Sequence, residues 1–206
     1  MSTAYAARPA WRASPAILAR LLAGLWLFGT GEGLLVGSHL GNSPWSVLAQ
    51  GVSVQTSISV GTATIIISFL VLALWIPLRQ WPGLATLLNA ILIGVALDAT
   101  LALVPDGLPL ALRVLEIPLA LALVALGSGL YINAGRGPGP RDGLMTGLHR
   151  RTGRPVGLIR TAIELIALTA GALLGGTFGV GTVAFALLIG PSVALALRLV
   201  RPTAPG

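Results

Sequence analysis

Two charged side chains lie four residues apart inside a long apolar stretch of the sequence. Arg160 and Glu164 belong to the run 156–174, in which most other residues are apolar. In a helix, this spacing puts both side chains on one face. Because charge is costly to bury in a membrane, such a pair is either a structural ion pair that fastens a helix bundle or a site that binds a substrate or a proton.

Two single acids interrupt other apolar stretches. Glu32 lies in the first of these stretches and Asp98 in the third, and we expect both towards the outer half of the membrane. A lone acid in such a position either belongs to the polar layer at the end of a span or lines a path through the membrane. Both alternatives stay open for each residue.

A charged pair of neighbours follows Pro140. Asp142 would fall in the first turn of a helix that begins there, where an acid suits a helix cap. The free N–H groups of the same turn, assisted by Arg141, could instead bind an anion.

The remaining composition argues against most other chemistry. The chain has no cysteine and two histidines, His39 and His149, so we expect no disulfide, no thiolate catalysis and no metal site. No phosphate-binding loop and no Ser/His/Asp set occurs, and we expect neither an enzyme nor a cofactor. The net charge is +7 from 13 arginines and 6 acids; in a membrane protein such an excess is typical of cytoplasmic loops, and we expect no nucleic-acid partner.

The elements that must hold these residues are membrane spans. Only 9% of the residues are charged, against about 25% in a soluble domain, and the mean hydropathy is +0.90. A helix that crosses a bilayer needs about 20 mostly apolar residues. Six stretches qualify, and the first is interpreted as a retained span rather than a signal peptide: 16–36, 60–78, 83–104, 112–132, 156–174 and 179–200.

Two connections between these stretches, 37–59 and 133–155, are too long for tight turns. Each opens with an elbow rich in glycine and proline, GSHLGNSP in the first and NAGRGPGP in the second. About ten residues that favour a helix follow in each, 45–54 and 141–150. Ten helical residues span ~15 Å, about half of a bilayer core. We therefore predict two half-helices, either re-entrant or lying at the interface.

The second half of the chain repeats the first at an offset of 96 residues. Over 31–104, 22 of the 74 aligned positions are identical without a gap. Several of these are Gly or Pro at the elbows, such as Gly41 with Gly137 and Pro44 with Pro140, where the backbone selects the residue. The alignment predicts two copies of one three-span unit.

The duplication also extends the candidate site. The counterparts of Arg160 and Glu164 are Thr64 and Ser68, so the paired positions are polar in both halves. Transporters built from inverted repeats bind substrate near the midplane, where broken helices meet. The candidate substrate-binding residues are Arg160, Glu164, Thr64, Ser68, Arg141 and Asp142.

The arginines predict the orientation. We expect a plasma-membrane protein with both termini in the cytoplasm. The connection 37–59 then lies outside and contains no arginine, whereas the connection 133–155 lies inside and contains five. Units with three spans then insert in opposite senses. The arginines near the two termini also fall on the cytoplasmic side in this orientation: Arg8, Arg12, Arg20, Arg198 and Arg201. Arg150, Arg151 and Arg154 form a cluster that we expect to contact anionic lipids. The outer join at 105–109 and its flank carry Arg113, but also the acids Asp106 and Glu116.

Three stretches resemble the YczE/YyaS/YitT family of bacterial multipass membrane proteins, most closely the YczE type. They are LGNSPWSVLAQGVS, GPGPRDGLMTGLHRRTG and VGLIRTAIELIALTAGALLGGTFGVGTVAFALLIGP. The resemblance runs from about residue 21 to 200 and implies a plasma-membrane location without implying a substrate. The positions that match are Pro140, Arg141, Asp142, Gly143, Arg160, Glu164, Gly181, Thr182 and Gly190.

Together these patterns predict an all-α, polytopic membrane helix bundle. Its six spans form two inverted three-span repeats, 16–104 and 112–200, each with a half-helix after a Gly/Pro elbow, between short tails at 1–15 and 201–206. The function expected is a small secondary transporter or permease for an anionic or zwitterionic solute. The alternative is a membrane accessory protein that does not transport and instead binds or organises a partner.

Overall fold

The computed structural model of this chain describes residues 11–105 and 107–200. Within these ranges the chain forms helices and connecting segments, with no β-strand. Arg8, Asp106 and Arg201 lie outside the described residues, as do most of the predicted N-terminal tail and the whole predicted tail at 201–206.

Six helical segments are long and apolar enough to cross a membrane. They confirm the six spans predicted from sequence, with ends that differ by at most two residues. The segments are α1 (Pro15–Ser38), α3 with α4 (Val60–Ala73 and Trp75–Leu78), α5 (Leu84–Leu103), α6 (Leu110–Asn133), α8 (Val156–Leu173) and α9 (Val180–Leu199).

The second span runs from residue 60 to 78 as predicted, with an interruption at Leu74 that the sequence did not predict. The helix α3 ends at Ala73, and the short α4 begins at Trp75. Pro77 lies in α4 and explains the break, because a proline has no N–H for the helical ladder and its ring collides with the carbonyl four residues earlier, that of Ala73.

Both predicted half-helices form, and both are longer than expected. They are α2 (Pro44–Thr56) and α7 (Pro140–Thr152), each of 13 residues or about 20 Å. The two prolines begin the helices instead of ending the elbows, because the first helical position needs no N–H donor. Each helix continues to a residue with positive φ, Ser57 in one case and Gly153 in the other.

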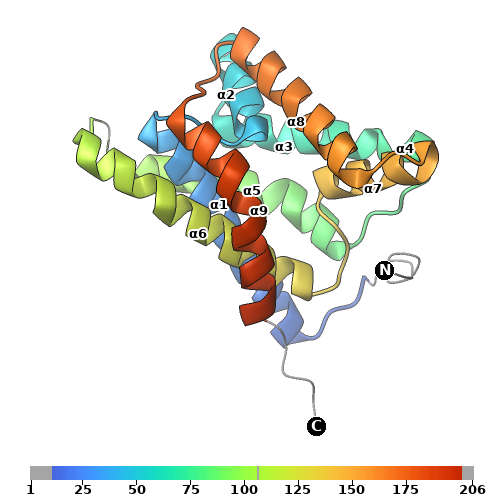
Figure 1. The fold of residues 1–206 in the computed structure, drawn as a ribbon. Coiled ribbons are helices and arrows are strands. Elements are labelled where there is room, and N and C mark those ends of the chain that lie inside the picture. Colours follow the sequence, from blue (N-terminus) through green and yellow to red (C-terminus); the bar gives the residue numbers. More distant parts are fainter. Residues whose placement is uncertain (1–10, 106, 201–206) are drawn as a thin grey trace.

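The helices form two groups (Figure 1). In one group α1 packs along α5 and α6, and α6 packs against α9. The contact between α1 and α6 is close because glycines face each other. A Cβ on Gly24 would lie 2.9 Å from the carbonyl oxygen of Gly127, and one on Gly127 would lie 2.5 Å from that of Gly24. Small residues of this kind let membrane helices approach closely.

The other group contains α2, α3, α4, α7 and α8, and it combines segments from both halves of the chain. The half-helix α2 packs against α8 and also α3, while α7 packs against α3 and α4 and also α8. The elbows cross between the halves as well. The N–H of Gly181 donates to the carbonyl of Leu40 at 2.9 Å, and the N–H of Ala85 donates to that of Arg136 at 3.0 Å. Each half-helix thus contacts the opposite half as well as its own.

The two halves differ in how their last two spans meet. The helix α3 packs on α5 with Gly61 against Gly94, so closely that a Cβ on either glycine would collide with the carbonyl oxygen of the other. The counterparts at the 96-residue offset, Gly157 on α8 and Gly190 on α9, have no such neighbour within 4 Å. Figure 1 shows α8 and α9 diverging from the loop that joins them.

Candidate functional site

A small cavity of about 40 Å³ lies where the two helix groups meet. Glu32 of α1 is buried in its wall, with 1% of its surface exposed. One carboxylate oxygen, Oε2, accepts hydrogen bonds from the hydroxyls of Ser43 at 2.7 Å and Ser46 at 2.6 Å. The other oxygen, Oε1, is buried and has no hydrogen-bond partner among residues 11–105 and 107–200. An unpaired buried carboxylate oxygen is costly, which marks this position as a functional candidate.

The cation that faces this free oxygen is Arg141. Its Nη2 lies 4.0 Å from Oε1 of Glu32, which is close enough for attraction but too long for a hydrogen bond. The guanidinium carbon also lies 5.4 Å from the centre of the Phe28 ring, one turn before Glu32 on α1. Arg141 therefore sits between an anion and an aromatic face without a short bond to the anion.

The indole of Trp75 positions the start of α7, and with it Arg141. Its Nε1–H donates to the carbonyl of Pro140 at 2.9 Å, and the ring is 2% exposed. The ring lies directly on Gly143, where a Cβ would collide with it. Trp75 is the first residue of α4, directly after the interruption at Leu74, so this part of the second span supports the site.

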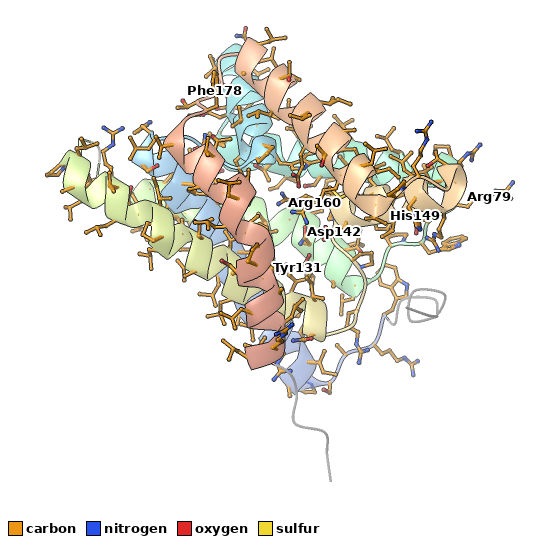
Figure 2. All side chains as sticks on the ribbon, viewed as in Figure 1. Arg79, Tyr131, Asp142, His149, Arg160 and Phe178 are labelled. Atoms are coloured by element: carbon orange, nitrogen blue, oxygen red, sulfur yellow. The ribbon has the colours of Figure 1, made fainter. Side chains whose placement is uncertain are left out.

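A larger cavity of about 330 Å³ lies on the other side of Arg141, between α8 and α9. Arg160 and Glu164 form an ion pair in its wall, with 2.9 Å between Nε and Oε1. Opposite them, the hydroxyl of Tyr131 donates to the carboxylate of Asp142 at 2.9 Å. Figure 2 shows Arg160, Asp142 and Tyr131 together in the space between α8 and the other helix group.

The structure divides the six candidate substrate residues between the two cavities. Thr64 and Ser68 line the small cavity, whereas Arg160, Glu164 and Asp142 line the large one. Arg141 lines both. The Arg160–Glu164 pair is partly exposed, with side-chain exposures of 49% and 28%, rather than enclosed in a packed interior. Asp142 lies in the first turn of α7, and its carboxylate bonds to Tyr131.

The two lone acids have different surroundings. Glu32 lies in the small cavity beside Arg141. Asp98 of α5 instead caps the start of α3: it accepts from the backbone N–H of Gly61 at 2.7 Å and from the hydroxyl of Ser59 at 2.6 Å. Asp98 thereby fastens α5 to α3 at the contact between Gly61 and Gly94.

Several residues at the cavities were not singled out from sequence. Ser46 and Trp45 could have been found, because they are the repeat counterparts of Asp142 and Arg141. Asn89 and Tyr131 had no such signal, since their counterparts are the apolar Phe185 and Leu35.

The arginine cluster at the C-terminal end of α7 lines neither cavity. Arg150, Arg151 and Arg154 are exposed, and Nη1 of Arg151 donates to the carbonyl of Pro77 at 2.7 Å. Nδ1–H of His149 donates to the carbonyl oxygen of Arg154 at 2.6 Å, and Figure 2 shows His149 and Arg79 at the same end of the molecule. The cluster thus lies at one end of the α4 and α7 helices.

The model of a family described as "Family of unknown function (DUF6198)" matches residues 17–198, from the start of α1 to the last turn of α9. The chain belongs to this family. The matched residues include all six apolar helices. These helices and a relative named a membrane protein show that the chain is a multipass membrane protein.

Three curated relatives agree with this assignment. A Haemophilus influenzae protein named "Uncharacterized protein" is 37% identical over 96% of this chain and 91% of its own length. The "Uncharacterized membrane protein YczE" of Bacillus subtilis is 35% identical over 82% of this chain and 79% of its own length. "Uncharacterized protein YyaS" of the same organism is 26% identical over 77% and 81%, respectively. The resemblance to the YczE and YyaS proteins is thereby confirmed. No solved structure matches this chain.

Proposed function

We propose that this protein is a small secondary transporter for an anionic or zwitterionic solute, built from two inverted repeats that exchange roles during transport. The observation that carries the proposal is the relation between the two cavities. Every residue that lines the small cavity, apart from Ile67 and Val71, has its counterpart at the 96-residue offset in the wall of the large one. Glu32 corresponds to Ser128, Thr64 to Arg160, and Asn89 to Phe185.

The same site is therefore present twice, as a small cavity of about 40 Å³ in one half and a larger one of about 330 Å³ in the other. Two unequal copies of one site are what alternating access requires, because each repeat adopts in turn the arrangement of the other. The residues common to both cavities include Trp45 and Arg141, which are counterparts of each other. A solute held at Arg141 would face the small cavity or the large one without leaving its place.

The two glycine pairs are the surfaces at which each repeat would close when the repeats exchange roles. Gly61 and Gly94 close α3 onto α5, and Gly157 and Gly190 offer the same surface on α8 and α9. Gly157, Arg160 and Glu164 share one helix face by their spacing, and the last two line the large cavity. If α8 closes onto α9 at the glycines, the large cavity should shrink to resemble the small one, whose half of the chain has α3 in contact with α5.

The charges near the cavities favour the solute class. Arg141 and Arg160 are the cations of the large cavity, and Asp142 and Glu164 are its acids. One arginine would hold the carboxylate or other anionic group of a solute, and an acid would hold the ammonium group of a zwitterion. Arg141 is better placed than Arg160 as the fixed cation, because it alone of the two borders both cavities.

Closure can be tested by cross-linking, since the chain has no native cysteine. In proteoliposomes, the double variant Gly157→Cys with Gly190→Cys should form a disulfide on mild oxidation, because closure would bring the two Cα atoms within ~7 Å. Uptake is measured by mass spectrometry of the vesicle lumen after incubation with a defined pool of amino acids and carboxylates. We expect oxidation to abolish uptake of the transported solute, and a reductant to restore it.

The control pairs Gly157→Cys with Leu195→Cys, which is exposed five residues further along α9. This pair should neither cross-link nor respond to oxidation. Failure of the first pair to cross-link would refute closure at the glycines. Uptake no greater than in empty vesicles for every compound in the pool would refute transport and favour the accessory-protein alternative.

If the repeats are inverted, the C-terminal ends of α2 and α7 should lie on opposite sides of the membrane. Thr56 and Thr152 are counterparts at the ends of α2 and α7; both are exposed, and each donates to the carbonyl four residues earlier at 2.7 Å. With both termini in the cytoplasm of a bacterium, a membrane-impermeant thiol reagent added to intact cells should label Thr56→Cys and leave Thr152→Cys unlabelled. Both should react once the membrane is permeabilised.

Labelling of both sites in intact cells would contradict the inverted repeat. In the orientation proposed, Arg150, Arg151 and Arg154 face the cytoplasmic leaflet, where anionic lipid headgroups attract exposed arginines by about 1 kcal/mol each. This attraction would favour the same orientation of the plasma-membrane protein during insertion.

A further inference from the structure

We infer that Glu32 and Arg141 form a switch that binds a proton and a solute carboxylate together. The inference rests on the proposed transport function and names its coupling ion. Arg141 would pair with the carboxylate of Glu32 when no solute is present. When Glu32 takes up a proton, Arg141 would pair with a carboxylate of the solute instead.

The geometry around Glu32 separates its two oxygens. Oε2 is held by two serine hydroxyls, which fix the carboxylate in place whether or not it is protonated. Oε1 is buried without a hydrogen-bond partner in the wall of the small cavity, and it faces Nη2 of Arg141 across 4.0 Å. Oε1 is therefore the atom that can accept a proton without breaking an existing hydrogen bond.

Arg141 is held in a way that allows it to change partners. At 4.0 Å its guanidinium is attracted to Glu32 without a hydrogen bond to it, and the Phe28 ring supports it from another side. Its side chain is 27% exposed and borders the large cavity, from which a solute would arrive. The buried indole N–H of Trp45, which lines both cavities and has no acceptor, is a further donor for the incoming carboxylate.

Charge balance links the two binding events. One ionised carboxylate beside Arg141 leaves the buried site neutral, whereas two would leave it with an uncompensated negative charge in a medium of low dielectric constant. A proton from water that adds to Oε1 of Glu32 removes the first negative charge as the solute supplies the second. One proton therefore enters the site with each solute carboxylate, and both leave together when the site opens on the other side.

Three other charged groups on helices that pack around Glu32 have hydrogen-bond partners. On α7, Asp142 is bonded to Tyr131, and on α5, Asp98 is bonded to Ser59 and Gly61. On α6, Arg113 donates to the carbonyl of Ser38, and Glu116, whose buried Oε2 has no hydrogen-bond partner in the described part of the chain, lies near Arg113 and His39. Among the described residues, Arg141 is the cation that forms an ion pair with Glu32.

The experiment measures how fast phenylglyoxal, a reagent specific for arginine, modifies Arg141 in purified protein in nanodiscs. Mass spectrometry compares Arg141 with Arg150, exposed on the same helix, so that effects of pH on the reagent cancel. The variant Glu32→Gln, which resembles the protonated residue, should raise the ratio roughly fivefold. In the native protein the ratio should rise as the pH falls from neutral to mildly acid.

Acetate serves as the carboxylate probe in the same assay. It should protect Arg141 of the native protein better at acid than at neutral pH, and it should protect Arg141 of Glu32→Gln equally at both. The matched control Glu164→Gln should increase the modification of Arg160 and leave Arg141 unchanged.

If the ratio of Arg141 to Arg150 modification changes neither with Glu32→Gln nor with pH, the switch is refuted and Glu32–Arg141 is a structural contact. The native pH series requires no variant, so it decides the question even if Glu32→Gln fails to fold. Because no step involves transport, a negative result here leaves the cross-linking result standing, and failure of transport leaves this one standing.

Discussion

Replacing Gly127 with leucine should prevent the protein from folding. A Cβ at this position would already lie 2.5 Å from the carbonyl oxygen and 2.6 Å from the N–H nitrogen of the facing helix, at Gly24 and Phe28. Neither backbone group can move aside as a flexible side chain would. Overpacking of an ordinary core costs about 1–3 kcal/mol, and separating two membrane helices along their main contact should cost more. The measurement is the yield of monodisperse protein in detergent, followed by its thermal unfolding.

Gly190→Leu is the matched control, because no atom of the rest of the fold lies within 4 Å of a Cβ at that position. This variant should fold and unfold at the same temperature as the native protein. Under the proposed mechanism it should nevertheless lose transport, since the larger side chain would keep α8 away from α9. A native melting temperature for Gly127→Leu would show that the contact between α1 and α6 is not the close one described above.

Replacing Trp75 with alanine should cost ~3–5 kcal/mol of the free energy of unfolding, the range for a large aromatic side chain removed from a packed interior. The indole is 2% exposed, rests on Gly143 and donates to the carbonyl of Pro140. Its loss should also loosen the start of α7 and raise the reactivity of Arg141 towards phenylglyoxal. Unfolding by increasing amounts of a denaturing detergent measures the first effect.

Two further variants separate the contributions of volume and hydrogen bonding. Trp75→Phe keeps most of the ring volume and lacks the N–H, so it should cost only about 1 kcal/mol. Trp81→Ala removes an indole that is 72% exposed and should leave stability unchanged. Equal losses for Trp75→Ala and Trp81→Ala would contradict a packing role for Trp75.

The sequence was sufficient to predict the spans. Helices that cross a membrane must satisfy their own backbone hydrogen bonds within one segment, so a run of about 20 apolar residues is by itself a strong signal. The half-helices were also predicted, because a Gly/Pro elbow before a short helical stretch is a local pattern. Their ends were missed by one or two residues, since Pro44 and Pro140 serve as the first helical residue instead of ending the elbow.

Contacts between side chains four residues apart on one helix could also be predicted from the sequence. The Arg160–Glu164 ion pair forms as expected, because a separation of four residues determines the geometry within one helix. Thr64 and Ser68 do line a cavity, but a different one from Arg160 and Glu164. Contacts such as Gly61 with Gly94 decide which helices close onto each other. The repeat has the same glycines in both halves, so the sequence does not show which of the two pairs is in contact.

Only the tertiary structure decided which charges meet. Glu32, Ser46 and Arg141 come from α1, α2 and α7, and nothing in their spacing along the chain brings them together. They meet because glycines set the distances between the helices and because Trp75 of α4 fixes the start of α7. Local periodicity therefore determined the helices of this protein, whereas the site depends on close contacts between helices distant in sequence, which periodicity does not encode.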